Sequence, residues 1–355
     1  MKIAMICFSL TGFATGSRLK EALETETCRV ILDKKSRYLP DAITGSTGEW
    51  TAEQFEKADA LIFIGACGIA VRSIAPYIVS KKKDPAVLVV DECGKFVISL
   101  LSGHLGGANE LAEQASELLG AQCVVTTATD LHGRFAVDVF AKKNQAEIRN
   151  MTAAKEVSAA ILAGEPVGFY SEFPWEGELP KGLIPCSRDG LPIEKGKMQT
   201  VPDTGVAVTI HRGCQPFPST TAVIPKVLYL GMGCKKGKDK ETIAHAARKM
   251  LEEHDFCKEA FHKIASIDLK KEEKGILALA ENWQIPFETY TAEELLAVPG
   301  EFTPSTFVKG ITGVDNVCER SAVLAAGKGR LLQRKTGGDG VTTAVAAAEW
   351  RIHFE

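Results

Sequence analysis

The chain of 355 residues carries 42 basic and 45 acidic side chains, and its formal net charge of -3 excludes a general attraction to nucleic acid or anionic membranes. With 45% hydrophobic and 25% charged residues, the composition is that of a globular protein, and no apolar run is long enough to span a bilayer. A chain of this length exceeds one ordinary hydrophobic core, so we expect roughly two or three domains.

Ten cysteines are spread along the chain, and no pair has the two-residue spacing of zinc or redox motifs. Most lie in apolar runs, as Cys7 and Cys123 do, which favours buried thiols in a reducing compartment over disulfides. The apolar start at residues 1–8 has the hydropathy of a signal peptide, but Thr11 and Gly12 end it and charged residues follow at once. This start predicts a first β-strand, and we expect a cytoplasmic protein.

Short apolar runs alternate with helix-like segments over the first 145 residues. Strands are predicted at 3–8, 60–64, 87–90, 96–100 and 123–126. Thr51 with Gln54 three residues later predicts a capping box, and 108–119 has apolar residues at helical spacing with Gly120 in the expected C-terminal position. This alternation predicts a parallel or mixed sheet covered by helices.

The regular alternation of strands and helices ends near residue 145, and prolines become frequent. A predicted helix at 152–163 and strands at 167–170 and 206–210 are separated by repeated prolines, and a second proline-rich piece follows at 216–225. This composition predicts a small, irregular middle domain with a linker.

Regular alternation resumes at Val227. We predict strands at 227–230 and 264–268, a loop at 231–237, and helices at 239–254, 272–283 and 316–326, with a Thr291/Glu294 capping box and a segment of uncertain type at 341–349. The expected fold class is therefore α/β: two α/β domains with parallel or mixed sheets, at 1–145 and 226–355, joined by a smaller, irregular middle domain at 146–225.

The most unusual stretch runs from Ser99 to Glu110, where Gly103, Gly106 and Gly107 lie between a predicted strand and a helix start. Such a loop can direct free backbone N–H groups outward beside the positive end of a helix dipole, which suits phosphate or carboxylate. The spacing matches neither a dinucleotide fingerprint nor a Walker A sequence. A tight turn without a ligand is the alternative. His104 lies in this loop and could act as a general base, although a capping role for its ring is the simpler interpretation.

Three further features could meet an anion. Arg72 stands on an otherwise apolar helical segment after the strand at 60–64. A lysine run at 81–83 follows, and such a run is usually a solvated loop. The small polar residues 126–130 end a strand, where ligands of open α/β sheets bind, although an Asx-type turn is the plain alternative.

The last third repeats this pattern. Lys235 and Lys236 stand in a glycine-containing strand-to-helix junction, and Lys335 opens another predicted cationic glycine loop at 335–343. Glu319 is a candidate acid/base, but Asn316 three residues earlier makes a capping box, which is the favoured interpretation. Histidines 245, 254 and 262 lack the spacing of a helical zinc pair. A large polyanionic ligand held between domains explains these cationic loops most simply.

The segments 68–76, 81–87, 100–111 and 126–130 resemble the N-terminal domain of the CbiG family, the cobalt-precorrin-5A hydrolases of anaerobic cobalamin biosynthesis. The segments 230–237 and 267–270 with Glu273, 312–314 with Glu319, and Lys335 before 342–346 resemble its C-terminal domain. The run Leu-Ser-Gly-His-Leu-Gly-Gly at 101–107 is long and peculiar. At 235–236 the family pattern more often has arginine, a change that keeps the charge but weakens bidentate carboxylate binding.

The resemblance implies opening of the δ-lactone of cobalt-precorrin-5A and release of acetaldehyde to give cobalt-precorrin-5B. For this reaction we predict catalytic roles for His104 and Glu319. We predict substrate contacts from Arg72, Gly103, Gly106, Gly107, Asn109, Thr127, Asp130, Gly233, Lys235, Lys236 and Lys335. The substrate carries its own cobalt, so we expect no protein-bound metal or cofactor. The expected partners are the cobalt-precorrin and neighbouring enzymes of corrinoid synthesis, with no nucleic acid and no membrane.

Two other classes of protein fit the same residues. A non-catalytic corrinoid carrier or scaffold of the pathway would bind without turnover. An α/β enzyme acting on nucleotides or sugar phosphates would be stabilised thermally by nucleotide rather than by corrinoid.

Overall fold

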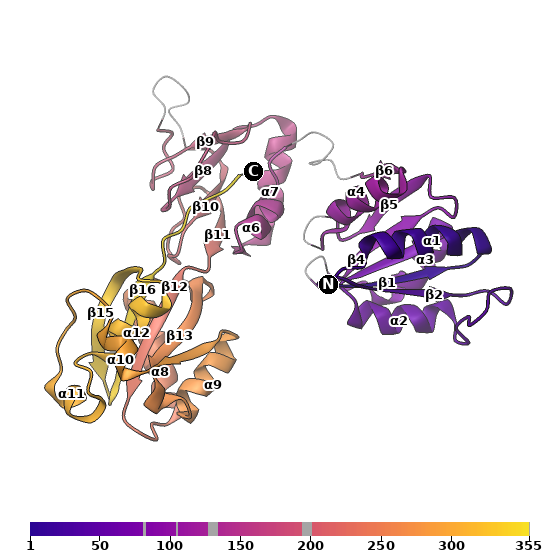
Figure 1. Ribbon diagram of the computed structural model, residues 1–355. Helices are drawn as coiled ribbons and strands as arrows, with labels where there is room; N and C mark the ends of the chain where they lie inside the picture. Colours follow the sequence, from indigo (N-terminus) through magenta and orange to yellow (C-terminus); the bar gives the residue numbers. More distant parts are fainter. Residues whose placement is uncertain (81–82, 104–105, 127–133, 194–200, 355) are drawn as a thin grey trace. The chain divides into compact units, whose positions relative to one another are not determined.

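The computed structural model describes residues 1–80, 83–103, 106–126, 134–193 and 201–354. It divides into two compact units, residues 1–134 and 135–355. The first unit holds a six-stranded sheet, and the second holds two five-stranded sheets (Figure 1). The predicted multi-domain α/β fold with parallel or mixed sheets is therefore confirmed. None of the described helices is long and apolar enough to cross a membrane.

The sheet of the first unit has the strand order β2-β1-β3-β4-β5-β6. Strands β1 to β4 are parallel, whereas β5 forms a hairpin with β4 and runs the opposite way, and β6 is parallel to β5. The loops that follow β5 and β6 therefore leave from the edge of the sheet at which β1 to β4 begin. The strands are β1 (Lys2–Cys7), β2 (Arg29–Lys34), β3 (Ala60–Ile64), β4 (Ala86–Val90), β5 (Phe96–Leu101) and β6 (Gln122–Val124).

Helices cover both faces of this sheet. One face packs against α1 (Leu10–Leu23) and α4 (Ala108–Leu119), and the other packs against α2 (Thr47–Lys57) and α3 (Cys67–Ile74). A short 3-10 turn, Ala75–Tyr77, follows α3. All five residues of β3 are buried because both of its faces are covered, which explains why it is apolar throughout.

The capping box predicted at Thr51 and Gln54 is wrong. Helix α2 begins one turn earlier, where the Ser46 side chain accepts from the Glu49 backbone N–H and the Glu49 carboxylate accepts from the Ser46 N–H. Thr51 and Gln54 lie inside the helix and are buried. By contrast, α4 matches its predicted range, and Gly120 ends it with a φ of 67°.

Residues 146–225 contain a regular sheet with the order β7-β11-β10-β8-β9, in which only β7 is antiparallel to its neighbour among the described pairs. Its strands are β7 (Ala146–Arg149), β8 (Val167–Ser171), β9 (Leu183–Pro185), β10 (Thr204–Val208) and β11 (Ser219–Pro225), and helices α6 (Val137–Lys143) and α7 (Met151–Ala163) pack on it. The linker expected within 216–225 is wrong, because β11 pairs with β7 and β10.

The last sheet has the order β14-β13-β12-β16-β15. Strands β12, β13 and β14 are parallel, and β16 is antiparallel to both β12 and β15. The carboxyl ends of β12, β13 and β14 therefore lie at the same edge as the turn between β15 and β16. The strands are β12 (Leu228–Cys234), β13 (Phe261–Ile267), β14 (Phe287–Tyr290), β15 (Arg330–Gly338) and β16 (Val341–Ala347).

Helices α8 (Lys240–Glu253) and α9 (Lys274–Trp283) pack on one face of this sheet, and α12 (Val317–Ala325) packs on the other. Two 3-10 turns, Lys258–Ala260 and Asp268–Lys270, and the short helices α10 (Ala292–Leu296) and α11 (Thr306–Thr312) complete it. The predicted N-cap Asp239 and the Thr291/Glu294 capping box are confirmed.

The C-terminal segment leaves β16 and packs on the middle sheet (Figure 1). Trp350 lies edge-on to Phe173, Ile352 is fully buried, and Phe354 stacks on Phe140 with 5.3 Å between ring centroids. The middle core is thus completed by residues that follow the last sheet in the sequence.

Candidate functional site

The glycine loop after β5 is compact because its residues touch one another. A Cβ at Gly106 would lie 2.3 Å from the Cβ of Ser102, and one at Gly103 would lie 2.7 Å from Oδ1 of Asn109. Ser102 itself has a φ of 59°, and Gly107 has a φ of 81°. Close packing therefore requires glycine at 106, whether or not an anion binds there, and a Cβ at 103 would require the Asn109 side chain to move.

The first backbone N–H groups of α4 donate hydrogen bonds to carbonyls of this loop. The Ala108 N–H donates to the Ser102 carbonyl at 3.1 Å, and the Asn109 N–H donates to the Gly103 carbonyl at 3.0 Å. We expected the loop to point several free N–H groups outward. This is wrong for Ala108 and Asn109, because their N–H groups already donate to carbonyls of the loop. His104 lies outside the described residues.

Asp84, which follows the lysine run, contacts the start of the glycine loop, and residues 81 and 82 of that run lie outside the described residues. Ser102 Oγ donates to the Asp84 carbonyl at 3.1 Å, and the buried Asp84 carboxylate accepts from the Val79 and Ser80 N–H groups. Because β6 is parallel to β5, the residues after it leave from the same edge. Thr127 and Asp130 lie outside the described residues.

Arg72 belongs to the opposite edge of the sheet. Helix α3 starts at the carboxyl end of β3, and the Arg72 side chain folds back over its first turn, with Nη2 3.3 Å from the Cβ position of Gly68. Strands of five residues at roughly 3.3 Å each separate the two edges by about 17 Å. The structure therefore does not bring Arg72 together with Gly103, Gly106 and Gly107.

A second group of predicted residues converges at the carboxyl edge of the last sheet. Lys235 and Lys236 follow β12 directly and are exposed. The Lys235 N–H donates to the Gly340 carbonyl at 2.9 Å, and the stem of its side chain lies against Gly340 in the turn between β15 and β16. The N-terminus of α8 faces the same edge. Two exposed cations therefore lie beside the start of α8, where the Asp239 carboxylate already accepts from the Thr242 N–H. Exposed lysines of this kind can pair with carboxylates.

The segment at 231–237 is not wholly a loop as predicted, because β12 extends to Cys234. Gly231 allows α12 to approach, since a Cβ there would lie 1.8 Å from the Cys318 carbonyl oxygen. At Gly233 a Cβ would lie 2.8 Å from Thr342 Oγ1 on the neighbouring strand. Both glycines thus serve helix-to-sheet and strand-to-strand packing.

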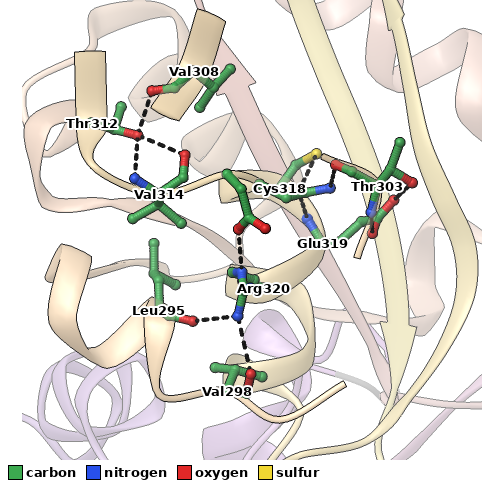
Figure 2. A network of polar contacts seen from close by, with 11 residues as sticks. Leu295, Val298, Thr303, Val308, Thr312, Val314, Cys318, Glu319 and Arg320 are labelled. Carbon is green, nitrogen blue, oxygen red and sulfur yellow. Dashed lines mark hydrogen bonds and ion pairs between the residues drawn. The ribbon is translucent and has the colours of Figure 1, made fainter. Parts of the chain in front are cut away.

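Glu319 is fully buried in the first turn of α12. Its carboxylate accepts from the Thr303 N–H and hydroxyl, at 2.9 and 2.8 Å (Figure 2), and from the Lys335 N–H at 2.6 Å. The predicted N-cap Asn316 accepts from the Glu319 N–H, but the carboxylate is directed to other segments. These contacts favour a role for Glu319 in holding Thr303 and Lys335 rather than in proton transfer.

Lys335 lies in β15 and not in a loop, which corrects the predicted cationic glycine loop. Arg320, one residue after Glu319, joins the end of α10 to Asp315, which follows α11 (Figure 2). Its guanidinium pairs with Asp315 at 2.9 Å and donates to the carbonyls of Leu295 and Val298. Two neighbouring residues of α12 therefore fix the backbone around the carboxyl edge.

The site prediction omitted an ion pair between Lys270 and Glu273. Lys270 Nζ lies 3.1 Å from Glu273 Oε2, and the two side chains are only 14% and 7% exposed. Glu273 Oε1 accepts from the Gly237 N–H at 2.9 Å, so the pair supports the lysine loop. The spacing of three residues between a lysine and a glutamate is the sequence signal for such a pair.

A cavity opens next to this edge, between α8 and the β15–β16 hairpin. Its lining includes Thr242, His245, Lys249, Thr336, Asp339 and Thr343. On the other face of the sheet, burial raises the pKa of the Cys318 thiol in α12 to about 11, which makes this thiol a poor nucleophile.

Three family models match successive parts of the chain. They are described as Cobalamin synthesis G N-terminal, over residues 49–130, Cobalamin biosynthesis central region, over 135–229, and Cobalamin synthesis G C-terminus, over 228–346. Among solved structures, a cobalamin biosynthesis protein G homologue from Sulfolobus solfataricus aligns at 24% identity with a TM-score of 0.40, covering 98% of this chain and 97% of that chain.

Two curated relatives share more sequence. The cobalt-precorrin-5A hydrolase of Salmonella typhimurium is 33% identical over 351 residues, covering 98% of this chain and 97% of that protein. The cobalt-precorrin-5A hydrolase of Priestia megaterium is 33% identical over 312 residues, covering 85% and 82%. With all three regions matched in order and one relative matched almost end to end, this chain belongs to the CbiG family of cobalamin biosynthesis.

Proposed function

We propose that this protein is an enzyme that hydrolyses cobalt-precorrin-5A, opening its δ-lactone and releasing acetaldehyde to give cobalt-precorrin-5B. The observation that carries the proposal is the 33% identity over 98% of the chain to a relative named cobalt-precorrin-5A hydrolase. The match leaves no domain-sized part of either protein unaccounted for, which favours retention of the whole activity.

The geometry at the carboxyl edge of the last sheet supports this proposal. A cobalt-precorrin carries several carboxylates around a flat macrocycle, and Lys235 and Lys236 present two exposed cations beside the N-terminus of α8. Ion pairs with carboxylates and hydrogen bonds from helix-terminal N–H groups suit such a ligand. We propose that Lys235, Lys236 and Lys335 bind substrate carboxylates in this way.

The reaction requires water to add to the lactone carbonyl, which leaves a carboxylate and a free hydroxyl. A base then removes the hydroxyl proton, the carbon–carbon bond breaks to form the carbonyl of acetaldehyde, and the electron pair enters the macrocycle, which takes up a proton. The substrate supplies its own cobalt and its own electron acceptor, so the protein positions it and transfers protons. We propose His104 for the proton transfer and no cofactor bound to the protein.

Within the cell we propose a cytoplasmic location. All ten cysteines are free thiols, and a reducing compartment keeps them so.

The test is to incubate the purified protein with cobalt-precorrin-5A and to measure acetaldehyde and the mass of the corrinoid product. We expect one acetaldehyde for each product molecule without added nucleotide or metal. Protein that has been unfolded by heat is the control. Binding of the substrate with its lactone intact after long incubation would instead establish the carrier function.

A further inference from the structure

The loop that carries Lys235 and Lys236 is fixed on both sides. At its start, the Lys235 N–H donates to the Gly340 carbonyl. After Lys236, the Gly237 N–H donates to Glu273 Oε1 at 2.9 Å, although Gly237 itself is exposed and has a φ of 71°. A Cβ at Gly275 would lie 2.9 Å from the Lys238 carbonyl, so the first turn of α9 also touches the loop. Only Lys236 stands between the two hydrogen-bonded positions.

Glu273 is an unusual partner for an exposed backbone. It precedes α9, but its side chain makes no capping bond to that helix. Instead its carboxylate, 7% exposed, is directed to Gly237, which lies 36 residues earlier. A buried carboxylate is costly unless it is paired, and Lys270 supplies the pairing charge at 3.1 Å.

The pairing charge also matters for an anionic ligand. An unpaired carboxylate behind the loop would repel a substrate carboxylate approaching Lys236. With Lys270 beside it, Glu273 holds the loop while its own charge is neutralised. A loop fixed before binding also loses less conformational entropy when the ligand arrives.

We infer that Glu273, paired with Lys270, is a positioning residue that fixes the 235–238 loop for binding of a polycarboxylated ligand. The inference rests on the proposed function for the identity of the substrate. This inference and simple electrostatics predict opposite results for the loss of the Glu273 carboxylate. Electrostatics alone predicts tighter anion binding, because a negative charge near the lysines is removed. Loss of the hydrogen bond to Gly237 predicts weaker binding.

The test compares Glu273→Ala and Glu273→Gln with Glu281→Ala, which removes an exposed carboxylate from α9, the helix that Glu273 precedes. Hydrogen exchange at the Gly237 amide, measured without ligand, reports the anchor. We expect faster exchange in Glu273→Ala, a KM about tenfold higher and a kcat changed less than about twofold. Glu273→Gln keeps an acceptor for Gly237 and should lie nearer to the unchanged protein, as should Glu281→Ala.

A second variant separates anchoring from folding. Lys270→Leu combined with Glu273→Leu replaces the buried pair by apolar side chains and should preserve the melting temperature while still raising KM. If Glu273→Ala lowers KM or leaves it unchanged, or if exchange at Gly237 does not accelerate, the inference is wrong.

A binding measurement tests this inference separately from the proposed function. The dissociation constant is measured for cobyrinic acid, a corrinoid with free carboxylate side chains. Absence of acetaldehyde from the unchanged protein would overturn the function. Weaker cobyrinic acid binding by Glu273→Ala would still support positioning, and equal binding, or no binding to either protein, would overturn it.

Discussion

Glu172 and His211 form a pair at the junction between the middle sheet and the last sheet, with Oε1 and Nδ1 2.8 Å apart. The second carboxylate oxygen of Glu172 accepts from the Ile210 N–H at 3.1 Å. His211 forms an isolated bridge with Phe256, which lies between α8 and β13. The pair therefore links the charge state of one histidine to a contact between two sheets of the same unit.

The pKa values of both groups depend on this pair. The hydrogen bond to Glu172 raises the pKa of His211 above 6.5 against the effect of burial, with help from Asp255 and opposition from Arg188. Burial pushes the pKa of Glu172 upward, but hydrogen bonds from His211 and Ile210 outweigh it and hold that pKa below 4.5.

The signs of these two shifts predict a pH window. A raised histidine pKa stabilises the fold below about pH 6.5, and this contribution is lost as the pH rises through the folded value. A lowered glutamate pKa stabilises the fold above about pH 4.5 and is lost on acidification. We expect thermal stability to fall between pH 6 and 8 more steeply in the unchanged protein than in His211→Gln. His245→Gln, on the outer helix α8, is the control, and identical slopes in all three proteins would contradict this assignment.

The C-terminal segment should stabilise the middle sheet through Asn144. This buried side chain donates to the His353 carbonyl at 2.8 Å and accepts from the His353 N–H at 2.9 Å, across 209 positions of sequence. We expect Asn144→Ala to lower the free energy of unfolding by about 1–3 kcal/mol and Ile352→Ala by about 2–5 kcal/mol, measured by urea titration. His353→Ala should be nearly neutral because only its backbone is used. An equal loss in His353→Ala would show that the hydrogen bonds to Asn144 are not the cause.

Replacement of Lys235 and Lys236 by alanine should weaken substrate binding. Two exposed ion pairs at ~0.5–1 kcal/mol each predict a KM about tenfold higher with a smaller change in kcat. The dependence of KM on salt should also become shallower. A variant with alanine at Lys226 and Lys328, near the opposite end of the same sheet, removes equal charge and should leave KM nearly unchanged. Similar effects of the two double variants would show that net charge, and not this loop, sets KM.

His104→Ala tests the proposed proton transfer. A positioned acid/base contributes about 10²-fold or more to turnover, so kcat should fall by this factor while the protein stays folded. Single-turnover rate and melting temperature are measured on one preparation. A variant that melts earlier but turns over at the full rate per folded molecule would identify His104 as structural.

Much of the fold could be predicted because buried strands and helix starts leave local signals. β3 is apolar throughout, Gly120 ends α4, and Asp239 caps α8 as expected. Strand direction leaves no such signal. The apolar pattern of β5 is the same whether it runs parallel or antiparallel to β4, and only pairing in three dimensions reverses it.

The candidate site was predicted less completely, for a related reason. Lysines 235 and 236 were found because charge beside glycine at a helix start is visible in sequence. Glu273 supports that loop through Gly237, 36 positions away in the sequence, and Glu319 supports Lys335, 16 positions away. Sequence patterns do not show contacts over such separations. Glycines 231 and 233 resembled a ligand loop, but their small size serves the approach of α12 and of Thr342. Packing across the sheet imitates a binding motif at these two positions.

The reversal of β5 and β6 places the glycine loop and Arg72 at opposite edges of the first sheet, and we expect the two edges to contribute independently to stability. Arg72 lies over the start of α3 at one edge, and Ser102 turns toward Asp84 at the other, about 17 Å away at roughly 3.3 Å per residue. Side chains at this separation with no shared partner act additively, with coupling within about 0.5 kcal/mol. The effects of Arg72→Ala and Ser102→Ala on stability should therefore sum, so that either edge can change its sequence without compensation from the other.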